Sequence, residues 1–378
     1  MAARPAVAAR TLTDANPAAR RGVADFRRCR RAWDLSASSR RSLGAVEDSP
    51  DEDVADALRR ALAVYYFPGM WDWDRAFVER LTIAELKRSL PDPSAELARA
   101  EAALTRYFRW APGVDVFAPV RIAADFEVRL PDPGAPERGL LDATGRPVDY
   151  AGRIDLLMTD EADRYWLLRH RVSRGAWTSE QLLRLDDRDV ADCWAWQAFF
   201  PGLEIAGTVS NELRLDLATE TSPMPPPSER SARLAQHAPS GGGRSIPTHR
   251  RARLAAVEQA ETFRVDADDA FRRTWIARSP REIDAAAART GMIALDMMDP
   301  ALRVYPTPSP AHCPECPFQA PCVAMNEGQS AEELLAASYR VRRRPTVEPG
   351  RLGAVTWGMG RGAAPPGWAR PDPDHREP

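Results

Sequence analysis

The chain has 378 residues, of which 44% are hydrophobic, and its formal net charge at pH 7 is −2. This length and apolar content suffice for a large hydrophobic core, whereas the near-neutral charge excludes a global basic field that would attract nucleic acid. No apolar run reaches the length of a membrane span, and no hydrophobic segment follows the N-terminal arginines as a secretory signal would require. We therefore expect a cytoplasmic protein with no membrane partner.

Arginine dominates the basic residues. Lys and Arg together number 52, and Lys87 is the single lysine. A mechanism that requires a lysine therefore has one candidate residue.

The first third of the sequence predicts helices. Residues 20–35 contain a helix start, and residues 51–66, 75–90 and 94–109 carry apolar side chains at helical spacing. Strand patterns take over at residues 125–130, where apolar and polar side chains alternate.

The later elements are mixed. We predict a strand pair at residues 154–158 and 165–168, an apolar helix at 189–200, strands at 203–215 and 271–276, and a helix from Ser279 to about Met298. The Ser279-Pro280-Arg281-Glu282 run is a capping box. The fold class expected is therefore α/β.

Three segments predict disorder because they lack apolar periodicity. These are residues 1–20, a Pro-, Ser- and Gly-rich insertion at 221–250, and a Pro-, Gly- and Arg-rich tail at 346–378. The remaining chain, residues 21–345, is expected to form a single domain.

The central strand pair carries the most unusual polar residues. Asp155 lies within an apolar run, where a carboxylate is costly unless it is paired or holds a metal. The second strand ends in Arg169-His170-Arg171. An acid on one strand facing this triplet on its neighbour indicates a site.

The cysteines give the most specific signal. Cys313, Cys316 and Cys322 follow a C-x2-C-x5-C spacing, and such clustered thiols are more often metal ligands than disulfides in a cytoplasmic protein. Cys193 lies in the apolar helix and is read as a core residue, which leaves Cys29 as the fourth ligand. Spacing alone fits a [4Fe–4S] cluster or a zinc ion.

Arginines flank this cysteine set at both ends of the chain. Arg27, Arg28, Arg30 and Arg31 surround Cys29, and Arg342 and Arg343 follow a short helix downstream of Cys322. If Cys29 shares a metal with the C-terminal cysteines, the two groups share one face and form a local phosphate-binding surface.

The order of these features resembles the RecB-like branch of the PD-(D/E)XK nuclease superfamily. The run R-x-C-R-x-x-W-x-L, the GRIDLL hairpin, the Trp-rich helix and the terminal C-x2-C-x5-C occur in the same succession as in its iron–sulfur members, the CRISPR-associated exonucleases and the AddB-type recombination nucleases. The resemblance implies a restriction-endonuclease-like mixed core sheet flanked by helices, with a metal-cluster clamp joining the N- and C-terminal segments. It favours [4Fe–4S] over zinc at the four cysteines.

The same resemblance implies a degenerate active site. Asp155 matches the family's first acid, whereas the second acid and the lysine fall on Arg169 and Arg171, and Glu127 is a weak match to an additional strand acid. Two carboxylates and a lysine are needed to hold Mg²⁺ or Mn²⁺ beside an attacking water, and an arginine cannot act as a base at neutral pH. We expect a protein that binds DNA in repair, recombination or defence without cutting it, with Arg169 and Arg171 contacting phosphate.

Two alternatives remain. Ligands such as Glu127, Asp149 or Glu180 could have migrated to Asp155 and sustained a Mg²⁺- or Mn²⁺-dependent exonuclease. A zinc-stabilised interaction protein is the other reading. A helicase or nuclease partner protein is compatible with the resemblance.

Overall fold

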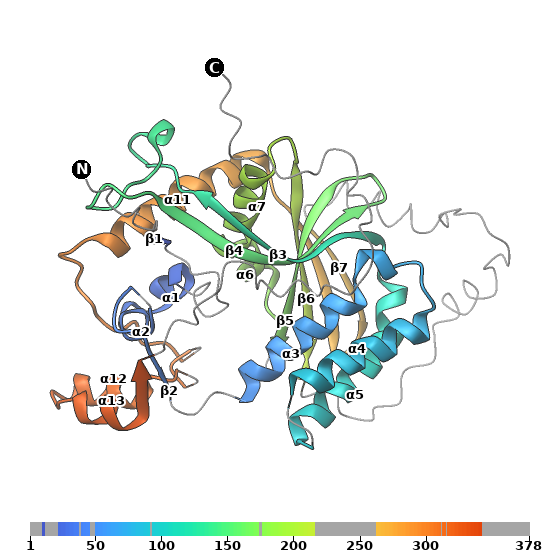
Figure 1. Cartoon of the computed structure of the whole chain (residues 1–378), viewed down its shortest axis with the longest axis horizontal. Coiled ribbons are helices and arrows are strands. Elements are labelled where there is room, and N and C mark those ends of the chain that lie inside the picture. The colour runs from blue at the N-terminus through green and yellow to red at the C-terminus, as the bar shows by residue number, and fades with distance from the viewer. Residues whose placement is uncertain are drawn as a thin grey trace, which may run out of the picture.

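A mixed sheet lies between two helical layers in the computed structural model of the chain (Figure 1). The structure describes residues 10–11, 22–37, 39–45, 50–90, 93–173, 176–215, 262–310, 312–314 and 316–341. The predicted α/β class is therefore confirmed. No helix in this part of the chain has the length and apolar character of a membrane span.

The helices follow the expected order. They are α1 (Gly22–Arg28), α2 (Arg30–Ser36), α3 (Pro50–Tyr65), α4 (Arg75–Ser89), α5 (Ala95–Trp110), α6 (Glu180–Arg184), α7 (Asp187–Phe199), α11 (Pro280–Met298), α12 (Gln319–Asn326) and α13 (Glu332–Ser338). Side-chain caps set several of their starts: Ser94 accepts from the Leu97 backbone N–H, and Ser279 accepts from the Glu282 backbone N–H as the capping box predicts.

The strands form two sheets among the described residues. They are β1 (Arg10–Thr11), β2 (Leu43–Ala45), β3 (Phe117–Arg129), β4 (Val148–Asp160), β5 (Tyr165–Ser173), β6 (Ile205–Arg214), β7 (Thr262–Asp268), β8 (Phe271–Ala277) and β9 (Tyr339–Val341). The seven-stranded sheet runs β1-β4-β5-β6-β8-β7, and β3 also pairs with β4. The β5–β6 and β1–β4 pairs are parallel and the others are antiparallel.

Each face of this sheet has its own core, because side chains alternate along a strand. Leu156 of β4 and Leu168 of β5 pack on the side of α3, α4 and α5, whereas Leu157 and Leu167 pack on the side of α7 and α11. Figure 1 shows these two helical layers on opposite sides of the strands. Burial of both faces is typical of a central sheet in an α/β protein.

A buried aspartate fixes the predicted hairpin. Leu156 and Leu157 pair in antiparallel register with Leu168 and Leu167, which confirms the strand pair. At the turn, the Asp160 carboxylate accepts hydrogen bonds from the backbone N–H groups of residues 162 and 164, from Arg164 Nε at 2.9 Å and from Trp166 Nε1 at 2.9 Å. The turn is therefore held by the last residue of β4 itself.

Some boundaries differ from the sequence prediction. Strand β3 begins at Phe117, eight residues before the predicted start, because its first half contains Pro119 and a register shift and does not alternate. Residues 10–11 form the short strand β1, although a disordered tail is predicted there. The predicted insertion at 221–250 and the tail at 346–378 lie outside the described residues.

Elements α2 and β2 form one lobe with α12, α13 and β9. Strand β2 pairs antiparallel with β9, and Arg41 Nη2 lies 2.9 Å from Glu332 Oε2. A small apolar core from both segments lies between them, to which Leu35, Leu43, Phe318 and Leu335 contribute. The N- and C-terminal segments are thus joined by ordinary protein contacts.

A buried arginine connects the sheet to the helical layer formed by α3, α4 and α5. Arg273 of β8 is completely buried and forms an ion pair with Asp115. Its guanidinium also donates to the hydroxyls of Tyr66 (3.1 Å) and Tyr107 (3.0 Å) and to Asn211 Oδ1. A charge with this many partners is stabilised only while all of them stay in place.

We predict that Arg273→Met lowers the free energy of unfolding by about 3–5 kcal/mol, because Asp115 would be left as an uncompensated buried charge. Urea denaturation measures the change. Arg88→Met is the control, since Arg88 pairs with Glu85 on the exposed surface of α4 and its loss should cost less than about 1 kcal/mol. Equal effects of the two changes would show that the buried network contributes little.

Candidate functional site

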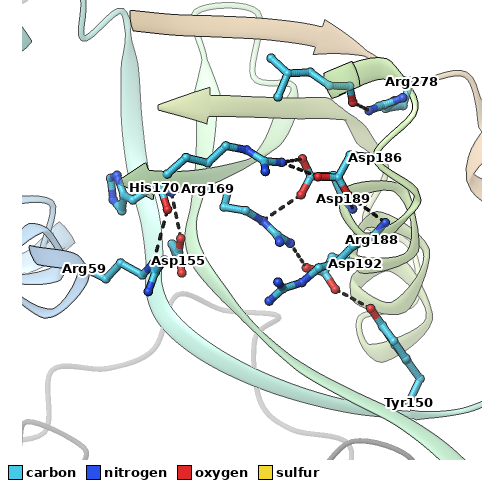
Figure 2. Close-up of polar contacts among 12 residues, drawn as sticks. Arg59, Tyr150, Asp155, Arg169, His170, Asp186, Arg188, Asp189, Asp192 and Arg278 are labelled. Carbon is cyan, nitrogen blue, oxygen red and sulfur yellow. Dashed lines mark hydrogen bonds and ion pairs between the residues drawn. The ribbon is translucent and has the colours of Figure 1, made fainter. Parts of the chain in front are cut away.

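Asp155 lies on β4 next to the start of the polar triplet on β5. Its Oδ2 atom accepts a hydrogen bond from the backbone N–H of His170 at 2.9 Å. Figure 2 shows Arg59, from the helical layer, beside Asp155 and His170. The Arg59 Nε donates to the His170 carbonyl oxygen at 3.4 Å, so α3 approaches the site at this point.

The two strand arginines point at helix α7. Arg169 Nε lies 2.8 Å from Asp189 Oδ1, and its Nη2 pairs with Asp192. Arg171 Nη2 lies 2.6 Å from Asp186 Oδ2 and 2.7 Å from Asp189 Oδ2. Helix α7 thus presents three carboxylates to two guanidinium groups of β5 (Figure 2).

Burial makes these contacts obligatory. Only 16% of the Arg169 side chain and 25% of the Arg171 side chain are exposed. Burial alone would lower the pKa of the Arg169 guanidinium, but the carboxylates of Asp189 and Asp192 raise it well above its usual value. Arg169 therefore stays charged at every pH at which the protein is folded.

The environment of the two strand arginines differs from the sequence prediction. The sequence places Asp155 between two guanidinium groups that are available to phosphate, whereas both groups are engaged by α7. The charges of both strand arginines are therefore offset by acids of α7. The neighbouring Arg153 adds no net charge because it forms a bidentate pair with Asp125.

The pocket at this site is very small. Asp155, Asp189, Asp192, Arg169 and Arg153 are among its lining residues, and it encloses about 10 Å³. A cavity needs about this much volume to hold a single water molecule. The arrangement therefore leaves little room for an additional ligand.

The acids proposed as migrated ligands have other partners. Asp149 Oδ1 lies 2.8 Å from Arg129, and Glu180 Oε1 lies 3.1 Å from Arg184. Glu127 is exposed opposite residue 151, four positions from Asp155, or about 13 Å along the strand. Burial and the nearby Asp149 raise the pKa of Glu127. The single lysine, Lys87, pairs with Glu101 on the helical layer.

The acids that do meet the site carry a sequence signal that the motif comparison misses. Asp186, Asp189 and Asp192 recur every three residues, which places them on one helical face. Arg169 and Arg171 are two residues apart on a strand and share one face of the sheet. Complementary charge at these two spacings would have predicted the pairing.

The four predicted cysteine ligands come together at one cavity. Cys29, Cys313, Cys316 and Cys322 all line a cavity of about 210 Å³ in the lobe formed by α2 and β2 with α12, α13 and β9. All four are free thiols. The described residues contain no group of three or more Cys, His, Asp or Glu side chains placed to hold a single metal ion. Cys193 is fully buried in the α7 core, as predicted.

Each of the four sulfurs receives an N–H group. The backbone N–H of Thr307 donates to Cys29 Sγ at 3.5 Å and that of Ser309 donates to Cys313 Sγ at 3.2 Å. A third backbone N–H, from Phe318, donates to Cys316, and Arg31 Nη1 lies 3.4 Å from Cys322 Sγ. Because a neutral thiol is a weak acceptor, these donors suit thiolates, although burial raises the pKa of the Cys316 thiol.

The arginines around Cys29 have separate environments. Arg28 and Arg31 line the cysteine cavity, and Arg31 also donates to Asn326 Oδ1 at 2.8 Å. Arg27 pairs with Asp187 of α7, and the guanidinium of Arg30 stacks on Tyr305 at 5.1 Å. Arg342 and Arg343 lie outside the described residues.

Comparison with known proteins identifies no family. No family model matches the chain, and no curated protein matches it. Nine chains of solved structures match. One is the crystal structure of SSO0001, with 13% sequence identity over 72% of this chain and 84% of that chain and a TM-score of 0.28. At that TM-score the likeness supports no functional assignment.

His170 gives the site a pH dependence that can be measured. Burial lowers the pKa of His170 to about 4, although Asp155 opposes that shift, and Asn211 Nδ2 lies 2.9 Å from its Nδ1. Between pH 7 and pH 5 the unfolded chain therefore gains a proton that the folded chain excludes, and the free energy of unfolding should fall by about 2 kcal/mol from this group. Urea denaturation across this range should show a smaller loss in His170→Asn than in the wild type. Identical pH profiles would contradict this assignment.

Proposed function

We propose that the protein is a catalytically inactive relative of the RecB-like PD-(D/E)XK nucleases that binds DNA and carries a [4Fe–4S] cluster. The observation that carries this proposal is the ion pairing of Arg169 and Arg171 with α7. Those two residues stand where the family has its second acid and its lysine. Both of them form ion pairs within the protein.

The absence of cleavage follows from charge and space. A metal-dependent nuclease needs at least two carboxylates free to bind Mg²⁺ or Mn²⁺ and room for the attacking water. Here Asp189 and Asp192 neutralise Arg169, and the pocket beside Asp155 holds about 10 Å³. The Arg169 guanidinium lines this pocket, and a guanidinium cannot accept a proton from water at neutral pH.

The cysteine cavity supports the cluster. A [4Fe–4S] cluster is held by four cysteine thiolates, and its properties depend on hydrogen bonds to the sulfurs. Cys29, Cys313, Cys316 and Cys322 surround a cavity rather than a point, and each sulfur has an N–H donor. These residues fit the cluster, which would bond the first described helices to the C-terminal segment.

The DNA surface proposed here lies beside the cysteines. Arg169 and Arg171 beside the Asp155 pocket are already ion-paired with acids of α7, so they offer phosphate little attraction. Arg28, by contrast, is 48% exposed at the cysteine cavity, where its partner is Asp25 of its own helix at 3.0 Å. Together with Arg342 and Arg343 it would form a basic surface that spans both ends of the chain.

We predict that protein purified without oxygen is brown and contains about four irons and four acid-labile sulfides per chain. Cys29→Ser should lose iron and lower the melting temperature of the whole domain, because Cys29 is the only one of the four ligands that belongs to the N-terminal segment. Cys193→Ser is the control and should retain its iron. Stoichiometric zinc without iron would replace the cluster with the zinc-stabilised alternative.

We predict no cleavage of single- or double-stranded DNA with Mg²⁺ or Mn²⁺. Gel assays with end-labelled DNA test this, and Asp155→Ala is the control for a contaminating nuclease. Degradation by the wild type that disappears in Asp155→Ala would establish an active nuclease with migrated ligands.

We predict that DNA affinity falls steeply with salt, and that Arg28→Ala reduces the slope of log K against log salt by about one, as expected for one lost phosphate contact. Arg88→Ala is matched to it, because both arginines are exposed and pair with an acid three residues earlier. Fluorescence anisotropy at several salt concentrations gives the slopes. If Arg28→Ala and Arg88→Ala behave alike, DNA does not bind at the cysteine lobe.

A further inference from the structure

The pocket beside Asp155 already contains a cation that belongs to the protein. The guanidinium of Arg169 extends from β5 to α7, with Nε 2.8 Å from Asp189 Oδ1 and Nη2 paired with Asp192 Oδ2. Asp155 lines the same pocket from β4. Two carboxylates of α7 therefore contact this positive group, and the carboxylate of Asp155 lines the same pocket.

The surroundings of these carboxylates are those of ligands held in position. The Tyr150 hydroxyl donates to the second oxygen of Asp192 at 2.9 Å, and the backbone N–H of His170 donates to Asp155. Hydrogen bonds of this kind orient carboxylates around a bound cation. Asp189 and Asp192 are each only about 5% exposed, so their charges must be compensated inside the protein.

The other nearby arginines do not fill this role. Arg153 lines the pocket but is bound in a bidentate pair to Asp125. Arg171 pairs with Asp186 and Asp189 at the other end of the charged interface. Arg169 is the pocket-lining arginine whose ion pairs are with the pocket's own carboxylates.

We propose that the Arg169 guanidinium is the resident cation of this pocket, standing where a divalent metal ion would stand in an active site, and that the carboxylates around it bind a divalent cation once that guanidinium is removed. This inference rests on the proposed function, because it explains how a nuclease-like site persists without metal. With Arg169 in place, the cavity of about 10 Å³ cannot admit Mg²⁺ or Mn²⁺ with the waters that such ions retain. With Arg169 shortened, space opens beside the carboxylates of Asp155, Asp189 and Asp192, of which Asp189 keeps its ion pair with Arg171.

Titration calorimetry of the full chain with Mn²⁺ tests this proposal. The wild type should bind no Mn²⁺ at this pocket, whereas Arg169→Ala should bind one additional ion per chain and should gain thermal stability with Mn²⁺. Arg169→Lys is the matched control: it keeps a positive charge in the pocket and should behave like the wild type. Adding Asp155→Asn to Arg169→Ala should weaken Mn²⁺ binding at least about tenfold, which locates the ion.

Arg169→Gln guards against loss of folding, because its amide still fills part of the pocket and can donate to Asp189 while the charge is gone. Either neutral variant that is folded by circular dichroism and shows no Mn²⁺ binding beyond the wild type overturns the inference. Binding by the wild type at the same site, abolished in Asp155→Asn, overturns it as well. The proposed function is judged separately, by DNA cleavage and DNA binding of the wild type.

Discussion

Charges that are removed from water on both sides of an interface have to neutralise one another, and the contact between β5 and α7 is governed by this requirement. Arg169 and Arg171 on the strand face Asp186, Asp189 and Asp192 on the helix. Removing either arginine would leave buried carboxylates without that counter-charge, which is far more costly than losing a surface ion pair. The helix is thereby fixed in position over the strand.

The charge arrangement at this interface differs from that of a metal-dependent active site. In a metal-dependent active site the negative charge lies on the strands and the positive charge is a bound ion. Here the positive charge lies on the strand and the negative charge on the helix. Asp155 accepts a hydrogen bond from the His170 backbone, and the neighbouring acids are paired with arginines. The arrangement is an ion-pair network in which Arg169 and Arg171 each contact two carboxylates of α7.

Local patterns in the sequence predicted much of this fold. Helical periodicity placed α3, α4 and α5, and the apolar runs around Asp155 placed the β4–β5 hairpin, because one side-chain period determines each element. The extent of β3 could not be predicted, since Pro119 and the register shift interrupt its alternation. The partners of Arg169 and Arg171 were also missed, because motif positions along a strand say nothing about which helix packs over it. Cys29 could be associated with the C-terminal cysteines by counting thiols, but the N–H donors from Thr307 and Ser309 depend on tertiary structure alone.

Segments that precede residues 216–261 pair with segments that follow them. Strand β6, before this stretch, pairs with β8, after it, and β2 pairs with β9 in the same way. The cysteine cavity and the contact between α7 and α11 also draw on both parts. A single cut anywhere between residues 216 and 261 would thus produce two fragments that remain bound to each other through two strand pairings and a shared core. Neither fragment could complete its sheet alone, so the two parts behave as halves of a split protein that regain their structure only by association.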